Sequence, residues 1–173
     1  LCFLGDGASN AGVFFETMNM AALWGLPLIF IIENNEIAMG TRLEYHAADC
    51  ELHKRGIPFG MGHERLDSMD SLQVLADAKR IIEKVRTEKR PYLVEAMTYR
   101  FSGHGAADND QSLYRTKEEV AEHEKRDPIL LMQKYLRENN LMTDEKMEAI
   151  EAEQIAEVER IYELALESPF PEP

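Results

Sequence analysis

The chain has 173 residues, of which 45% are hydrophobic and 29% charged, and its formal net charge is −13. This length and composition predict an ordinary globular domain with a hydrophobic core. The negative charge argues against nucleic acid or an anionic membrane as a partner, since both require clustered Lys and Arg. Two cysteines cannot build a disulfide framework, and no apolar run approaches the roughly 20 residues of a membrane span.

The first 41 residues predict a βαβ unit. The apolar run 1–4 ends at the turn Gly-Asp-Gly of residues 5–7, and a helical pattern follows from about residue 10 to residue 24. The run 28–32 is apolar at every position, as expected of a parallel strand covered on both faces. Because the chain opens inside a strand pattern, we expect it to be a piece of a longer protein.

The middle of the chain gives weaker signals. Residues 42–58 lack a strong period and predict a loop with one short helical piece, and residues 63–66 predict a short strand. Asp70 is a candidate N-cap for a long amphipathic helix. Residues 92–98 predict the next strand. The segment 102–112 is rich in Gly, Asp, Asn and Ala, which predicts a mobile surface loop.

The last third of the chain predicts helices. Thr116 and Glu119 have the spacing of a capping box, and Thr143 opens a long helix with one apolar side. Together the patterns predict an α/β fold in which a parallel sheet is flanked by helices. We expect this α/β domain to span residues 1–116, and a helical C-terminal extension, residues 117–173, to pack on it.

Two polar residues follow the two strands of the βαβ unit. The carboxyl ends of neighbouring parallel strands meet at one edge of a sheet, about 5 Å apart, so Asp6 and Asn35 are expected to project into one small volume. A carboxylate, an amide oxygen and a main-chain carbonyl suit Mg²⁺ when a phosphate ligand supplies the remaining oxygens. Gly7 would let the backbone approach a diphosphate, and the helix starting near Asn10 would direct N–H groups toward it.

These residues resemble those of a known family. The stretch from Gly-Asp-Gly-Ala at 5–8 to Glu-Asn-Asn at 33–35 is similar to the thiamine-diphosphate fingerprint. Residues 5–41 resemble the alpha subunits of 2-oxo acid dehydrogenases, the pyruvate-specific ones most closely, and the resemblance continues through 99–104 and 112–116. It implies the diphosphate-binding domain of the thiamine-diphosphate-binding fold, with only the C-terminal half of the subunit present.

The resemblance also implies a role for individual residues. It makes Asp6 and Asn35 side-chain ligands of Mg²⁺ and gives Ile37 a main-chain carbonyl ligand. His104 would reach the diphosphate end of the cofactor as the one catalytic candidate. The complete cofactor-binding set that it implies is Gly5, Asp6, Gly7, Ala8, Asn35, Ile37 and His104.

The reaction implied is the oxidative decarboxylation of pyruvate, with transfer of the acetyl group to a lipoyl domain. The implied partners are a beta subunit, in an α2β2 heterotetramer, and a lipoyl-bearing acyltransferase. By the same resemblance the glutamate that activates the cofactor belongs to the beta subunit, so this chain alone is expected to be inactive. Thiamine chemistry of this kind resides in the cofactor, and the protein supplies placement and electrostatics.

Two other functions stay open. Acetoin dehydrogenase alpha subunits share the Gly-Asp-Gly turn and the Asn-Asn pair, so acetoin is the alternative substrate to pyruvate. A non-catalytic α/β nucleotide-binding or assembly module is the alternative of another class. That module gives no role to Asn35, and Asn10 stands where the dinucleotide fingerprint requires glycine.

Some residues have competing interpretations. His46, Cys50 and His53 have a spacing that zinc could use, but no fourth ligand is evident nearby, so we do not expect a zinc site. Tyr114 and Arg115 either anchor the 102–112 loop or contact a ligand.

The resemblance also bears on regulation and location. Animal mitochondrial members of the family carry regulatory serines where this chain has Gly105 and Ala107, and Ser112 lies near a third such position. Kinase control at the first two positions is therefore excluded here. This favours a bacterial source and a cytoplasmic location, with the mitochondrial matrix as the alternative.

Overall fold

The computed structural model describes residues 1–108 and 110–172. Residue 109, which belongs to the loop predicted to be mobile, lies outside the described residues. The chain forms two compact units, Leu1–Pro128 and Ile129–Pro173. The predicted boundary after residue 116, between the α/β domain and the helical extension, stays a prediction. Within the described residues, no helix combines the length and the apolar character that crossing a membrane requires.

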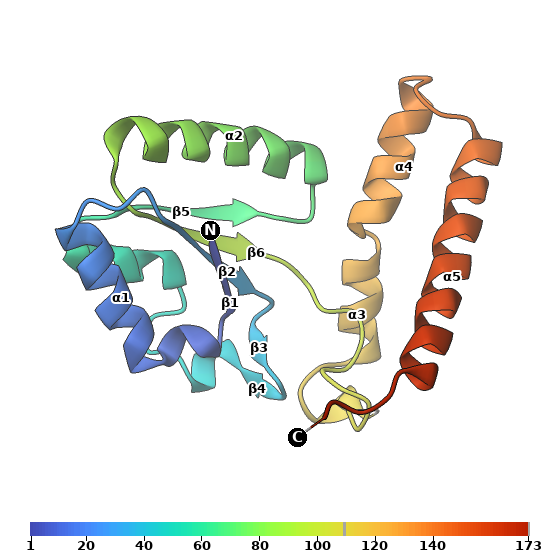
Figure 1. The fold of residues 1–173 in the computed structure, drawn as a ribbon, viewed down its shortest axis with the longest axis horizontal. Coiled ribbons are helices and arrows are strands. Elements are labelled where there is room, and N and C mark those ends of the chain that lie inside the picture. The colour runs from blue at the N-terminus through green and yellow to red at the C-terminus, as the bar shows by residue number, and fades with distance from the viewer. Residues whose placement is uncertain (109, 173) are drawn as a thin grey trace. The chain divides into compact units, whose positions relative to one another are not determined.

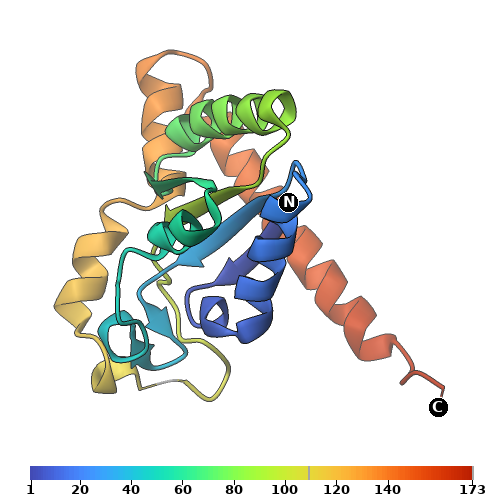
Figure 2. The ribbon, with the colours of Figure 1, turned by 90° about the vertical axis from the view of Figure 1, so that its left-hand side faces the viewer.

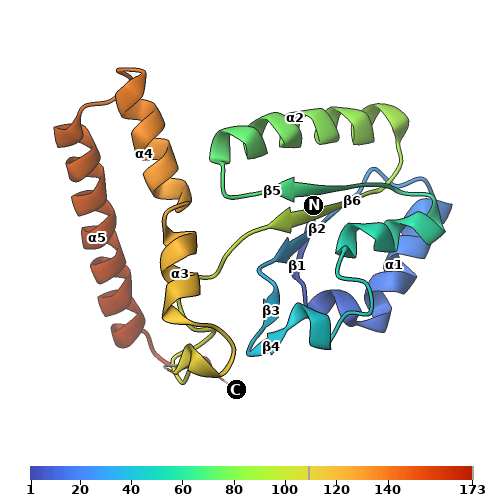
Figure 3. The same cartoon turned by 180° about the vertical axis from the view of Figure 1, so that it is seen from behind.

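Four parallel strands form the sheet of the first unit. They are β1 (Cys2–Gly5), β2 (Ile29–Asn34), β6 (Tyr92–Met97) and β5 (Gly62–Asp67), paired in that order. Figure 1 shows helices on both sides of this sheet, and Figures 2 and 3 show the same layers from the side and from behind. The predicted α/β class, a parallel sheet flanked by helices, is confirmed.

One face of the sheet carries the larger core. Helix α1 (Gly12–Leu23) links β1 to β2 and buries Phe14, Met18 and Ala21, a stripe at helical spacing. This helix begins two residues later than predicted, because residues 8–10 form a 3-10 turn first. The buried cluster on this face comprises Phe14, Met18, Ala21, Phe30, Ile32, Leu43, Ala47, Leu52, Met61 and Leu93.

The segment predicted as a loop at 42–58 is more regular than expected. A short hairpin, β3 (Ile37–Ala38) with β4 (Thr41–Arg42), precedes two 3-10 helices, η2 (Leu43–Tyr45) and η3 (Leu52–Phe59). Their buried leucines, Leu43 and Leu52, belong to the core of the first face. Strands β3 and β4 and helix η2 have only two or three residues, too few to produce a readable period, whereas the eight-residue η3 corresponds to the one short helical piece that was predicted.

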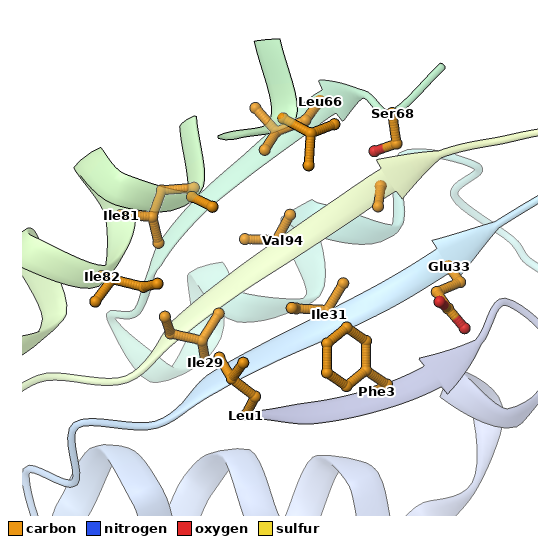
Figure 4. Close-up of a pocket in the computed structure, with 13 residues that line it drawn as sticks. Leu1, Phe3, Ile29, Ile31, Glu33, Leu66, Ser68, Ile81, Ile82 and Val94 are labelled. Atoms are coloured by element: carbon orange, nitrogen blue, oxygen red, sulfur yellow. The ribbon is translucent and has the colours of Figure 1, made fainter. Parts of the chain in front are cut away.

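The other face is covered only in part. Helix α2 (Ser71–Glu88) is capped by Asp70, as predicted, and packs over β5 and β6 with Ile81 and Val85 buried. Beside it lies an apolar groove of about 340 Å³ that extends to β1, where Phe3 is exposed. Figure 4 shows Phe3 and Ile31 on the floor of this groove. The strand 28–32 is therefore fully covered on one face only.

The rest of the chain is helical, as predicted. The elements are η4 (Gln111–Leu113), α3 (Lys117–Glu124), α4 (Pro128–Glu138) and α5 (Asp144–Glu167). The Thr116 hydroxyl accepts a hydrogen bond from the Glu119 N–H at 3.1 Å, which is half of the predicted capping box. The Glu119 carboxylate instead accepts a bond from Arg42 at 2.9 Å. An ion pair with a distant partner therefore replaces the local return bond.

Candidate functional site

The turns that follow β1 and β2 lie at one edge of the sheet. The two strands are parallel neighbours with Gly5 opposite Glu33, so Asp6 and Asn35 leave the sheet at the same, carboxyl, edge. Their separation along the chain is bridged by α1. The structure thus brings the two principal residues of the predicted metal site to adjacent strand ends, where ligands of open α/β sheets bind.

Gly7 allows the turn after β1 to approach β3, the strand that follows the Asn34–Asn35 turn. A Cβ atom placed on Gly7 would lie 2.6 Å from the Cβ of Ala38 in β3, which is closer than real side chains approach. The φ of Gly7 is −62°, so glycine is required here for space and not for backbone conformation. Gly5 meets no such constraint, because the space around its Cα is open. The close approach predicted for a diphosphate at Gly7 stays a prediction.

Asp6 is a buried carboxylate with two hydrogen-bonding neighbours. Its side chain is 4% exposed, and Oδ2 lies 3.2 Å from Nε2 of His46. Its main-chain oxygen accepts a bond from the hydroxyl of Ser9 at 2.5 Å. Sequence reasoning considered His46 only beside Cys50 and His53, yet the two histidines have different partners here. His46 contacts Asp6, and His53 contacts Glu95.

The Asn34–Asn35 turn is fixed by its own side chains. Asn34 Oδ1 accepts the N–H of Glu36 at 2.8 Å, and Asn35 Oδ1 accepts the N–H of Ile37 at 3.1 Å. Glu36 has a φ of +64°, a left-handed conformation that such Asx turns support. An amide oxygen has two lone pairs, so Asn35 Oδ1 retains one for a ligand.

Beneath this turn lies a buried carboxylate that sequence reasoning missed. Glu95 of β6 has a fully buried side chain, and its Oε1 accepts a bond from Asn34 Nδ2 at 2.7 Å. Its Oε2 accepts the main-chain N–H of His53 at 3.1 Å and lies 2.8 Å from Nδ1 of the same histidine. Arg65 Nη2 is 3.5 Å from Oε1. Glu95 thereby ties the Asn34–Asn35 turn to the core.

Arg100 connects the predicted ligand Ile37 with His104. Its Nη1 donates to the main-chain oxygen of Ile37 at 3.3 Å and lies 3.5 Å from Nδ1 of His104. Its Nη2 donates to the Met39 oxygen at 2.8 Å. His104 is therefore held toward the β3 side of the site. A guanidinium at this position favours an anionic ligand, such as a metal-bound diphosphate, over a bare dication.

The loop that carries His104 is anchored by two residues. Arg115 is buried and donates to the main-chain oxygens of residues 100, 101 and 102. Tyr114 donates to Asp108 Oδ2 at 2.6 Å, and the N–H of His104 donates to the same oxygen at 2.7 Å. These bonds, the tyrosine's first, lower the pKa of Asp108. The anchoring interpretation accounts for both Tyr114 and Arg115, whereas the predicted mobility of the loop stays a prediction.

The donor set has the chemistry that a hard dication requires. Asp6, Asn35 and the Ile37 carbonyl offer one carboxylate and two neutral oxygens, which leaves room for phosphate oxygens and water around Mg²⁺. The set contains no thiolate that would favour a softer metal. These residues therefore fit a metal-diphosphate group.

Known proteins resemble the chain along its whole length. The sequence pattern of the family described as "Dehydrogenase E1 component" matches residues 1–173. A chloroplastic pyruvate dehydrogenase E1 component subunit alpha-3 of Oryza sativa subsp. japonica is 43% identical over 171 residues, 99% of this chain and 40% of that protein. The pyruvate dehydrogenase E1 component subunit alpha of Rickettsia conorii is 40% identical over 170 residues, 98% of this chain and 52% of that protein.

Porphyra purpurea has a similar protein, also named pyruvate dehydrogenase E1 component subunit alpha. It is 38% identical over 170 residues, which are 98% of this chain and 49% of that protein. The chain therefore spans about half the length of the curated relatives that it matches. One of these relatives is chloroplastic and another is bacterial, so they leave the cellular compartment of this chain undetermined.

Proposed function

The chain belongs to the dehydrogenase E1 component family, and on that premise we propose that it is the diphosphate- and metal-holding part of a pyruvate dehydrogenase alpha subunit. The family depends on thiamine diphosphate. The enzyme proposed decarboxylates pyruvate oxidatively and passes the acetyl group to a lipoyl domain. The observation that carries the proposal is the placement of Asp6 and Asn35 just beyond the carboxyl ends of two parallel neighbouring strands, where Gly7 lies against Ala38 of β3.

In this proposal the chain's residues place the cofactor. Asp6, Asn35 and the Ile37 carbonyl would hold Mg²⁺, and the main chain at Gly5, Gly7 and Ala8 would face the diphosphate. When bound, thiamine diphosphate supplies the carbanion chemistry of decarboxylation.

On the loop side, Arg100 and His104 would contribute hydrogen-bond donors to the phosphate oxygens, with Arg100 as the fixed positive charge. Burial of Asp6 strengthens its attraction for the cation, because fewer water molecules screen the carboxylate.

The other half of the active site is proposed to come from outside these residues. A beta subunit would complete the site in an α2β2 assembly, and a lipoyl-bearing acyltransferase would accept the acetyl group. The relatives carry the word "alpha" in their names, which supports a second kind of subunit. Regarding location, we propose the bacterial cytoplasm, with the mitochondrial matrix as the alternative.

The test is a cofactor titration. Thiamine diphosphate with Mg²⁺ is titrated into the full-length protein co-expressed with its beta partner, and the variants Asp6→Ala and Asn35→Ala are compared with it. We expect both variants to bind at least about 10-fold more weakly. Glu33→Ala, which removes an exposed carboxylate two residues from Asn35, is the matched control and should bind normally.

Three results would contradict the proposal at different levels. Undiminished cofactor binding by both variants would refute the assigned ligands. Turnover of acetoin without turnover of pyruvate would replace the substrate with its alternative. Binding of adenine nucleotides in place of thiamine diphosphate would favour the nucleotide-binding module.

A further inference from the structure

His46 lies against Asp6 because its segment is tied to the second turn of the site. The Leu43 N–H that begins η2 donates to the Glu36 oxygen at 2.8 Å, and His46 follows at the end of that 3-10 turn. Leu43 itself is buried in the core. The imidazole therefore reaches Asp6 from a segment whose position is set by the Asn34–Asn35 turn.

Hydrogen bonding decides which nitrogen of His46 carries the proton. Arg55 Nη2 lies 2.8 Å from Asn10 Oδ1, and a guanidinium can only donate, so the Asn10 oxygen faces Arg55. The Asn10 amide nitrogen then faces His46 Nδ1 at 2.9 Å and donates to it. Nδ1 must accept, which leaves the proton on Nε2, the atom that faces Asp6. Nε2–H therefore donates the hydrogen bond to the Asp6 carboxylate.

Arg55 is held in turn by Ser9. Its Nη1 donates to the Ser9 main-chain oxygen at 2.7 Å and to the Ser9 hydroxyl at 2.6 Å. Ser9 is fully buried, and its hydroxyl donates to the main chain of Asp6. Arg55, Asn10 and His46 therefore form a chain of hydrogen bonds. It begins at Ser9, beside Asp6, and ends on the Asp6 carboxylate.

We propose that His46 is a positioning residue for the metal-binding carboxylate, an inference that rests on the proposed function. By donating Nε2–H to Oδ2, His46 fixes the rotation of the carboxylate and leaves Oδ1 for the cation. Oδ1 is then the carboxylate oxygen without a competing hydrogen bond, and it would be the preferred oxygen for Mg²⁺. Residues that hydrogen-bond to a metal ligand in this way typically contribute 10- to 100-fold to metal affinity.

The test measures how tightly Mn²⁺, a paramagnetic substitute for Mg²⁺, binds to the full-length protein. The protein is co-expressed with its beta partner, and thiamine diphosphate is saturating. Electron paramagnetic resonance gives the Mn²⁺ dissociation constant. We expect His46→Ala to bind Mn²⁺ about 10-fold more weakly or worse. His46→Gln should recover most of the affinity, because its amide Nε2 can donate to the same oxygen. His123→Ala is the matched control, since that imidazole stacks on Tyr99 and should leave Mn²⁺ affinity unchanged.

A second measurement does not require a variant. Nitrogen-15 NMR of labelled histidine in the unsubstituted protein should show His46 as the Nε2–H tautomer with an unprotonated Nδ1. A proton on Nδ1 would overturn the inference, as would equal Mn²⁺ affinity of His46→Ala and the unsubstituted protein. Equally weak binding by His46→Ala and His46→Gln would also overturn it, because donation would then not matter. Failure of the unsubstituted protein to bind Mn²⁺ would instead refute the proposed function, and this inference with it.

Discussion

At the sheet edge, Asp6 and Asn34 are fixed by partners from other parts of the chain, whereas His104 is fixed mainly by its own loop. Asn34 bonds to Glu95, 61 residues away, and Asp6 contacts His46, 40 residues away. In the loop, the N–H of His104 bonds to Asp108 only four residues along. The edge is therefore part of the folded core, and we expect the loop to open without unfolding the sheet.

This difference assigns separate tasks to the two regions. A site for a metal and its diphosphate needs ligands held before the group arrives, since preorganised groups lose little entropy on binding. The edge provides that rigidity through buried hydrogen bonds. The loop joins the edge through Arg100, which reaches the main-chain oxygens of Ile37 and Met39. Substitutions in the two regions should accordingly change different measured quantities.

The largest effect is expected at the edge, from Glu95→Ala. The substitution leaves Asn34 Nδ2 and the His53 N–H without their acceptor in a buried place. Removing one partner from a buried charged network costs about 3–5 kcal/mol, so the free energy of unfolding should fall by about that amount. Urea unfolding of the full-length protein measures it. Glu33→Ala, an exposed glutamate on the neighbouring strand, should change the free energy by less than about 0.5 kcal/mol.

A loss of less than about 1 kcal/mol for Glu95→Ala would contradict this comparison. It would mean that water reaches the place of the carboxylate and satisfies its hydrogen-bond donors, so that residue 95 is not buried as the structure describes.

The second effect tests the close approach of Gly7 to Ala38 of β3. Gly7→Ala places a Cβ against that of Ala38, and overpacking of this kind costs about 1–3 kcal/mol. Because the clash is with the Ala38 side chain, Ala38→Gly in the same protein should restore most of the lost stability. A double-mutant cycle by thermal unfolding gives the coupling energy. If Ala38→Gly gives no recovery, residue 7 does not lie against the Ala38 side chain.

The sequence predicted the parts of the fold and the site that depend on local patterns. Strand and helix periods lie within one segment, so the βαβ unit and the positions of Asp6 and Asn35 were readable. Glu95 gave a usable signal that was missed, namely a charge inside the apolar strand 92–97. His46 gave no such signal, because it follows a three-residue 3-10 turn. The partner of His46 is defined only by packing of the tertiary structure.

The third effect belongs to the loop, from Arg115→Lys. Lysine keeps the charge but lacks the planar fork that bonds to the main-chain oxygens of residues 100–102. Amide hydrogen exchange at residues 100–108 should become about 10-fold faster, which corresponds to about 1.4 kcal/mol of local opening. Exchange in β2 and β6 should stay unchanged. Arg126→Lys, in an exposed ion pair with Asp67, is the control.

Faster exchange in β2 and β6 as well as in the loop would contradict the separation of loop and edge. The loop would then unfold together with the sheet, and Arg115 would count as part of the core.

The smallest effect is the pH dependence of stability from an ion pair that belongs to neither region. The pair, Glu64 with Arg80, lies on the other face of the sheet. Arg80 donates two hydrogen bonds to Glu64, and these, with a further bond from Tyr92, lower the pKa of Glu64. A lowered pKa in the folded state means that the stabilisation is complete above the unfolded value of about 4.3 and is lost as the pH falls below it. The pair is partly exposed, so its contribution should stay below about 1 kcal/mol. The melting temperatures of the unsubstituted protein and Glu64→Gln should therefore differ at pH 7 and converge as the pH falls from 5 toward 3, whereas Mn²⁺ affinity at pH 7 should be the same in both.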